Sequence, residues 1–159
     1  GPFPAKDEWE ALWMAATRMT NRVKGVNRVV LLIHPLPADA GGQDPIVPRP
    51  DWLSLEPAFV EKYRLEVLRE ADALVMDLLE ETGVMDEIWQ CPTVLLPLRT
   101  KDGPVAVVRP IYSTRAMTAR AAPLPVEMME ALVARAGEVG VGGWMVDLTH
   151  KPPGTIEWE

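Results

Sequence analysis

The last nine residues of the sequence, Lys151 to Glu159, hold side-chain types that suit a phosphorylated, polar ligand. Lys151 supplies a cation that can neutralise a phosphate, and Thr155 and Glu157 can exchange hydrogen bonds with a polar ring. The Pro152-Pro153 pair fixes its own φ angles and keeps the preceding residue extended, so this segment, here called the tail, has little entropy to lose on binding. The alternative is a C-terminal strand or a loose end. The residues alone leave both interpretations open.

Other residues with chemical potential favour structural roles. His34 and His150 each follow a predicted strand and precede a proline, which is typical of half-exposed loop histidines. Cys91 lacks the small-residue elbow of a nucleophile and is interpreted as a small core residue. The Asp86-Glu87 pair near a helix end is interpreted as solvated charge. No glycine-rich phosphate loop precedes a helix, and no two histidines have metal-ligand spacing, so we expect no catalytic residue, metal site or cofactor in this chain.

The composition excludes several classes of partner. The chain has 159 residues, of which 48% are hydrophobic and 25% charged, and its net charge is −7 with a pI near 4.9. An acidic chain without a basic stripe does not suit nucleic acid or an anionic membrane. The single cysteine excludes an internal disulfide, no apolar run is long enough to span a bilayer, and no signal-peptide pattern opens the chain. We therefore expect a cytoplasmic protein.

A helix and a strand are predicted before a proline-rich stretch. Asp7 can cap a helix whose apolar residues recur at three- and four-residue spacing until Gly25. The apolar run Val29–Ile33 indicates a strand buried on both faces. Residues 34–55 are rich in proline and glycine without periodicity. We therefore predict a helix-strand piece over residues 1–36, a linker over 37–55 and a domain over 56–159.

The predicted domain begins with a helix from Glu56-Pro57 to Gly83. A strand over 93–98 interrupted by Pro97, a tight turn at Lys101-Asp102-Gly103 and a returning strand over 105–112 then predict a hairpin. A third helix from about Pro125 and a strand over 144–148 complete the unit. The order predicts a two-layer α+β sandwich, an α-β-β-α-β unit preceded by an extra α-β piece that echoes its last helix and strand.

The tail closely resembles the ending of glutamine-hydrolysing GMP synthases. Further stretches that resemble this family are Leu65–Asp72, Ile88–Gln90, Val94–Arg99, Met117-Thr118 and Asp147–Thr149. Residues 25–30 also resemble the helix-to-strand ending of the family's C-terminal dimerisation unit. Some members carry two such units in tandem, so the resemblance implies that residues 7–36 are the end of a first unit and residues 56–159 a whole second one.

The resemblance implies a role for particular residues. In this family a glutaminase domain releases ammonia, an ATP-pyrophosphatase domain adenylates XMP with ATP and Mg²⁺, and the C-terminal domain dimerises and completes the XMP site. By motif match, Lys151 would contact the XMP phosphate, Thr155, Ile156 and Glu157 would line the nucleotide, and Gln90 would also reach XMP. The hairpin loop of residues 100–104 is shorter than in many members, which puts in doubt whatever that loop contributes to closure or to the dimer.

Two hypotheses follow for the chain as a whole. The first is a non-catalytic dimerisation and XMP-binding fragment of a GMP synthase, favoured by the Gly1-Pro2 start without methionine. Its partners would be a second copy, XMP and the enzyme's other domains. The alternative is a free-standing homologue that acts as an interaction or purine-nucleotide-sensing module. The apolar strand 105–112 and the tryptophans Trp9, Trp13 and Trp52 exceed what one small core needs, so we expect a homodimer.

Overall fold

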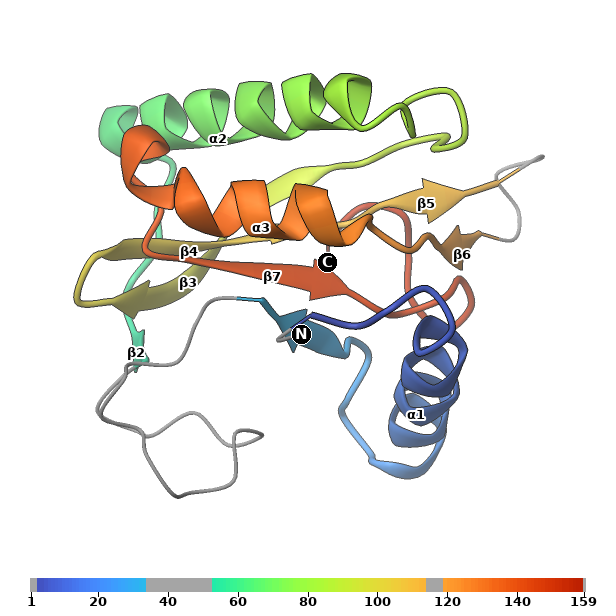
Figure 1. Ribbon diagram of the computed structural model, residues 1–159. Coiled ribbons are helices and arrows are strands. Elements are labelled where there is room, and N and C mark those ends of the chain that lie inside the picture. Colours follow the sequence, from blue (N-terminus) through green and yellow to red (C-terminus); the bar gives the residue numbers. More distant parts are fainter. Residues whose placement is uncertain (1–2, 34–52, 114–118, 159) are drawn as a thin grey trace, which may run out of the picture.

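The computed structural model describes residues 3–33, 53–113 and 119–158 (Figure 1). Expectations about His34, Trp52, most of the linker, Met117-Thr118 and Glu159 lie outside these residues. Within them the chain is α+β. Its elements in order are α1 (Trp9–Arg22), β1 (Val30–Leu32), β2 (Ser54–Leu55), α2 (Lys62–Glu81), β3 (Thr93–Thr100), β4 (Gly103–Val108), β5 (Ile111–Tyr112), β6 (Arg120–Ala121), α3 (Val126–Ala134), the 3-10 turn η1 (Ala136–Val139) and β7 (Gly143–Asp147).

The strands form one mixed sheet and one small ribbon. Five strands pair in the order β1-β7-β4-β3-β2, and β5 pairs with β6. Among the described strands, β4 and β7 run parallel and the other pairs are antiparallel. Pro97 falls where the β3–β4 register shifts, between Leu95 and Arg99, as expected for a residue that cannot donate to the ladder. Pro110 separates β4 from β5, so the predicted strand over 105–112 is two strands.

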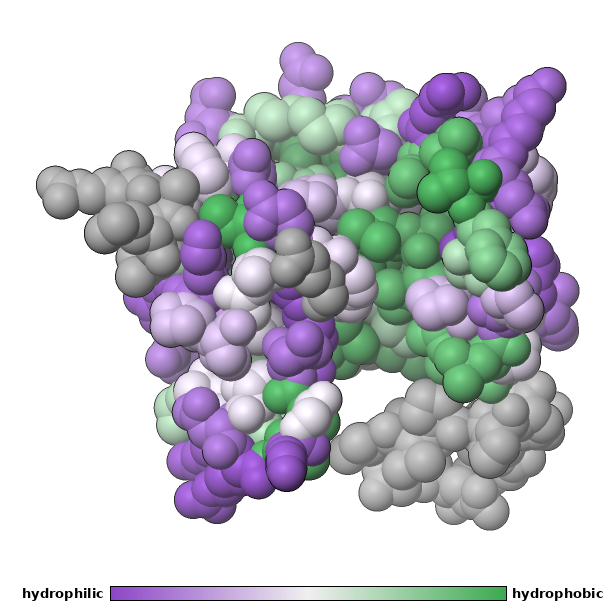
Figure 2. All heavy atoms as spheres, turned by 180° about the vertical axis from the view of Figure 1, so that it is seen from behind, coloured by the Kyte–Doolittle hydropathy of each residue, from purple (hydrophilic) through white to green (hydrophobic). Residues whose placement is uncertain are grey.

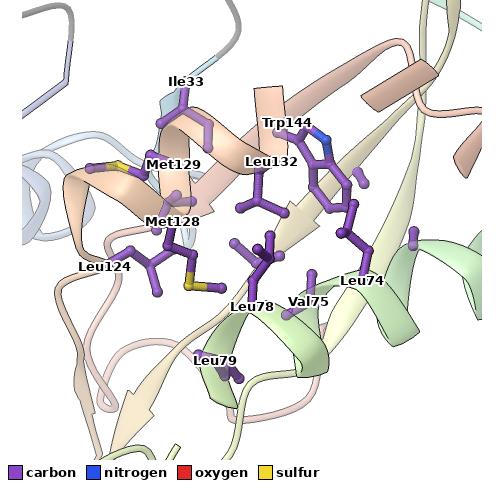
Figure 3. Packing of buried hydrophobic residues seen from close by; sticks show 14 of the residues in the cluster. Ile33, Leu74, Val75, Leu78, Leu79, Leu124, Met128, Met129, Leu132 and Trp144 are labelled. Atoms are coloured by element: carbon purple, nitrogen blue, oxygen red, sulfur yellow. The ribbon is translucent and has the colours of Figure 1, made fainter. Parts of the chain in front are cut away.

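Helices α2 and α3 cover one face of the sheet. Their apolar stripes meet over Trp144 of β7, which is fully buried (Figure 3). The core side chains labelled in Figure 3 include Leu74, Val75, Leu78 and Leu79 from α2, and Met128, Met129 and Leu132 from α3. Helix α1 stands at the end of the sheet in Figure 1, but its Trp9 and Ala16 belong to the same core. One core therefore joins the two parts that the proline-rich stretch separates in sequence.

The opposite face of the sheet has an apolar cluster of its own. Its buried members are Leu96, Val105, Val107 and Met145. Figure 2, seen from behind, shows apolar side chains gathered on this side of the molecule. The strand 105–108 is entirely buried, and so is Trp9. Of the residues on which the expected homodimer rested, this strand and Trp9 are buried within a single chain, Trp13 is half-buried, and Trp52 lies outside the described residues.

The ends of the elements correct several predictions. Helix α1 begins at Trp9, and Asp7 does not cap it: its N-cap is Glu8, which makes no side-chain capping bond and instead accepts a hydrogen bond from the Ala5 amide at 2.7 Å. Helix α2 begins at Lys62 instead of Glu56, because the Glu56 carboxylate is held by Arg64 at 2.9 Å and by Arg99 at 2.6 Å.

The strand predicted over 29–33 is present, but it is not buried on both faces. β1 lies at the edge of the sheet within the described residues, and its three residues are half-buried. The end of the predicted linker, Ser54-Leu55, pairs with β3 as the other edge strand.

Among the described residues, none of the helices has the length and apolar character that a bilayer-spanning segment needs.

Candidate functional site

The parallel pairing of β4 and β7 brings two charged residues together at the carboxyl ends of these strands. The register aligns Val108 with Val146, so the next residues along each strand, Arg109 and Asp147, are neighbours. Arg109 is 1% exposed and Asp147 is fully buried. Charges are buried at this depth only when they are paired and hydrogen-bonded. The tail begins close to this end of the two strands.

Arg109 makes hydrogen bonds with all three of its guanidinium nitrogens. Nη1 donates to Asp147 Oδ2 at 2.6 Å and to the Thr149 carbonyl at 2.8 Å. Nη2 donates to the Thr155 carbonyl at 2.7 Å and Nε to the Ile156 carbonyl at 3.1 Å. Burial lowers the pKa of Arg109 and nearby Arg28 lowers it further, while Asp147 opposes both effects. One side chain thus binds the end of β7 and the backbone of the tail together.

Arg28, which follows α1 and precedes β1, holds the tail from the other side. Its side chain is 9% exposed, and Nη1 donates to Asp147 Oδ2 at 3.0 Å. Nη2 donates to the Thr155 hydroxyl at 2.9 Å and to the Glu157 carbonyl. The guanidinium carbon lies 4.9 Å from the centre of the Trp158 ring, within cation–π range. Arg28 therefore ties the N-terminal piece to the last residues of the chain.

Asp147 and Thr149 complete the network. Asp147 Oδ1 accepts the Thr149 amide at 2.8 Å, and the Thr149 hydroxyl accepts the Val29 amide at 2.9 Å. With Arg28 and Arg109, two cations share one buried carboxylate, which leaves a local excess of positive charge. An excess of this sign beside the tail suits an anionic ligand.

The structure places the four predicted binding residues of the tail in different settings. Lys151 pairs with Ala119 through both backbone hydrogen bonds, at 2.8 and 3.3 Å. The Thr155 hydroxyl donates to the Glu157 carbonyl at 2.6 Å. Ile156 is buried, whereas the Glu157 side chain is exposed. The tail is therefore packed against the domain, which disfavours the loose-end interpretation.

Gln90 is the fifth predicted binding residue. It contacts β5, and β5 in turn packs against the tail. Its carbonyl accepts the Ile111 amide at 2.9 Å, and its side chain is exposed. Ile111 packs in a small apolar cluster with Ala119 and Ile156. Gln90 and the tail thus share Ile111 as a neighbour. The structure brings the predicted residues to one region, and their contact with a nucleotide stays a prediction.

Of the other candidates, His150 and Cys91 have the structural roles expected of them. His150 is partly buried, and its Nδ1 accepts the Ala121 amide at 3.0 Å. Burial lowers the pKa of His150, and the nearby charge of Arg120 lowers it further. Cys91 packs against the main core, and burial raises its pKa to about 12, which makes its thiol a poor nucleophile near neutral pH.

Sequence reasoning missed Arg28 and Arg109. Each is a single arginine beside an apolar stretch, Arg28 before one and Arg109 after one, where a surface cation is the ordinary interpretation. A signal was available for Arg109, because it lies between the four-residue apolar run 105–108 and Pro110, inside a stretch predicted to be a strand. Nothing local indicates that either side chain turns inward to the tail, since that depends on how β1, β4 and β7 pair.

Comparison with known proteins matches this chain to the GMP synthase C terminal domain over residues 77–158. A probable glutamine-hydrolysing GMP synthase of Leptospira interrogans is 34% identical over 155 residues, covering 96% of this chain and 24% of its own length. The GMP synthase of Bartonella quintana is 40% identical over 134 residues, covering 78% of this chain and 26% of its own. That of Streptomyces coelicolor is 44% identical over 112 residues, covering 63% and 21%. This chain thus spans about a quarter of the length of the curated relatives it matches.

Proposed function

The chain belongs to the GMP synthase C-terminal domain family, and we propose that it is the non-catalytic part of a glutamine-hydrolysing GMP synthase that binds XMP and joins subunits. The observation that carries this proposal is the range of the family match, which extends through the tail to residue 158. The chain's quarter share of its relatives' length supports the idea that glutaminase and pyrophosphatase functions, with ATP and Mg²⁺, belong to other domains. Those domains are the proposed partners.

The proposed XMP site is the region where the tail, Gln90 and the two arginines meet. Lys151 would contact the phosphate, Gln90 and Glu157 would bond to the nucleotide, and Thr155 and Ile156 would line it. The excess positive charge around Asp147 favours an anionic ligand, and the bonds from Arg28 and Arg109 to tail carbonyls hold the tail backbone before any ligand binds. A preordered tail loses less entropy on binding than a flexible one.

XMP binding is tested by titrating isotopically labelled protein with XMP and following backbone amide NMR shifts. We expect weak binding, with a Kd of about 1 mM or higher, because affinities of this order correspond to only a few kcal/mol and few contacts come from this chain. Shifts should concentrate on Lys151, Gln90 and residues 154–157. Lys151→Ala should weaken binding severalfold, while Lys101→Ala, in the β3–β4 turn, should not. Tight binding that survives Lys151→Ala would contradict the proposed role of that lysine.

The second part of the proposal is a homodimer. Large apolar side chains are exposed around β2 and the start of α2: Leu55 is 82% exposed, Phe59 69% and Val60 88%. Tyr63, on the first turn of α2, is exposed beside them. Several large apolar side chains gathered at the surface are typical of a protein–protein interface. We assign this surface, defined by Leu55, Phe59, Val60 and Tyr63, to contact with a second copy.

Light scattering across a range of protein concentrations tests the homodimer. We expect a mass of twice the 17.6 kDa chain at high concentration and a shift toward monomer when Phe59 and Val60 are both replaced by serine. The control is Met14→Ser with Met19→Ser, which removes exposed apolar groups from α1 instead. A chain that remains 17.6 kDa at every concentration would overturn the dimer and leave the surface to the enzyme's other domains.

The alternative function, a free-standing interaction or purine-sensing module, is favoured by the short hairpin. β3 and β4 are joined through Lys101-Asp102 alone, so this chain has little loop there to close over a substrate. The reading frame upstream of residue 1 distinguishes the two. A pyrophosphatase loop encoded there supports the fragment, and a start codon beside Phe3 supports the free-standing protein.

We also propose that residues 7–36 derive from the end of a first dimerisation unit and residues 56–159 from a second. The echo between the two helix-strand endings supports this division.

A further inference from the structure

Two segments far apart in the sequence form matching helix-to-strand endings. Gly25-Val26 follows α1 and leads into β1, and Gly140-Val141 follows α3 and η1 and leads into β7. Both glycines have positive φ, +86° and +71°, and both open a connection from a helical segment to a strand. Aligning the two sequence segments on these glycines makes Val29 the counterpart of Trp144, Leu31 of Val146 and Ile33 of Leu148.

The pairing between β1 and β7 is symmetric with respect to this alignment. Leu31 pairs with Val146, which is its own counterpart, and the pair Val30–Asp147 is the counterpart of Leu32–Met145. The bonds just beyond the ladder obey the same rule. The Ile33 amide donates to the Trp144 carbonyl at 3.1 Å, and its counterpart, the Leu148 amide, donates to the Val29 carbonyl at 2.9 Å. A local two-fold axis therefore passes between Leu31 and Val146.

Counterpart side chains in the two strands also pack on the same face of the sheet. Leu31 and Val146 both pack in the main core, and so do Ile33 and Leu148. Val30 and Met145 both pack in the cluster on the opposite face. Pairing of a strand with its own equivalent about a two-fold axis is the arrangement that identical subunits adopt in an isologous contact. Here both strands belong to one chain.

The charged residues break this symmetry. Arg28 binds Asp147, but the counterpart of Arg28 is Gly143 and the counterpart of Asp147 is Leu32. The ion pair is present at one end of the strand pair and absent from the other. It is present at the end where β7 continues into the tail, and there Arg28 also reaches Thr155 and Glu157.

We infer that β1 takes the place that a second copy's last strand would occupy beside β7, and that Arg28 acts across this internal axis as a positioning residue for the tail. Within the described residues, the two strand endings share one tail, which follows β7. Because β1 already fills the edge of β7, a homodimer of this chain uses a different surface. The inference concerns the position of the tail and does not require a nucleotide, so its failure is distinguishable from failure of the proposed XMP site.

The positioning role is tested by hydrogen exchange of the intact chain, comparing peptides from β7 with peptides from residues 149–158. Arg28→Ala should speed exchange of the tail amides by about tenfold to a hundredfold, since hydrogen bonds to charged groups are strong contributors, and leave β7 protected. Arg28→Lys should give an intermediate effect because it cannot keep the forked contacts. Arg22→Ala, at the exposed end of α1, is the matched control and should change nothing.

Two outcomes would overturn this role. Unchanged tail exchange in Arg28→Ala would show that the arginine does not hold the tail. Equal acceleration in β7 and the tail would show that Arg28 only keeps β1 in place.

Cysteine cross-linking tests whether β1 fills the edge of β7. Val146→Cys alone should give no covalent dimer on oxidation, whereas Leu31→Cys combined with Val146→Cys should give a disulfide within one chain, because paired residues on adjacent strands lie within disulfide reach. The parent chain, with its half-buried Cys91, is the blank. An interchain disulfide formed by Val146→Cys alone would show that β7 pairs with β7 of a second copy, and the inference would be wrong.

Discussion

Replacing Arg109 by methionine is expected to cost about 3–5 kcal/mol of the free energy of unfolding, the range for breaking a buried ion pair by removing one partner. Methionine roughly fills the space, so the cost comes from the polar groups left behind. The Asp147 carboxylate, which is fully buried, loses one of its two arginines, and the carbonyls of Thr149, Thr155 and Ile156 lose their donor. For a chain of this size the midpoint of thermal unfolding should fall by about 6–20 °C.

A matched control for Arg109→Met is Arg99→Met. Arg99 also pairs with a carboxylate, Glu56, at 2.6 Å, but its side chain is 39% exposed, so its loss should cost about 1 kcal/mol or less. Urea unfolding of both variants beside the parent chain makes the comparison. If Arg109→Met were no more destabilised than Arg99→Met, the network would not stabilise the fold.

A double variant separates the charge effect from packing. Replacing Arg109 by methionine and Asp147 by leucine removes both charges, and it should be more stable than Arg109→Met alone, because no buried carboxylate is left poorly paired. Arg28 loses Asp147 in this variant but keeps the Thr155 hydroxyl and the Trp158 ring as neighbours. A double variant that is less stable than either single change would indicate that packing, and not charge, dominates at this position.

The elements of the fold could be predicted from local pattern where burial dictates the pattern. The run 105–108, the proline interruptions at 97 and 110 and the helix from Val126 all follow from hydrophobicity and proline chemistry. The predicted start of a helix was wrong where a tertiary contact competed with a local signal. Glu56-Pro57 is a good first turn by sequence, but Glu56 pairs with Arg64 and Arg99, and the helix begins only at Lys62.

The site residues, too, could be predicted only where the signal is local in the sequence. The tail could be predicted because its residue types and its resemblance are contained in nine consecutive positions. The arginines that hold it could not, since Arg28 and Arg109 reach Thr155 only through the pairing of β1 and β4 with β7. Contacts that join residues more than forty positions apart leave no periodicity or spacing in the sequence. They are accessible only once the order and register of the strands are known.

The second large effect is expected at Gly142, where the connection from η1 to β7 passes against the β3–β4 hairpin. A Cβ added there would lie 2.3 Å from the Thr100 hydroxyl oxygen and 2.4 Å from the Gly103 amide nitrogen and carbonyl oxygen. The segments are also joined by hydrogen bonds, from the Gly142 amide to the Pro104 carbonyl at 2.8 Å and from the Thr100 hydroxyl to the Gly142 carbonyl at 3.0 Å. Because two of the three close atoms are backbone, the clash cannot be relieved by a side-chain rotation.

Gly142→Ala should therefore cost about 4 kcal/mol or more, at the extreme of single-residue effects, measured by urea unfolding. Gly137→Ala is the matched control. It lies in η1, is exposed and would meet nothing within 4 Å, so alanine there should be neutral or stabilising by about 0.4–1 kcal/mol through the unfolded state. Adding Thr100→Ala to Gly142→Ala removes only the side-chain clash and should restore little. Full recovery in that double variant would show that the hairpin backbone yields, and that the short hairpin is held against β7 less tightly than its geometry indicates.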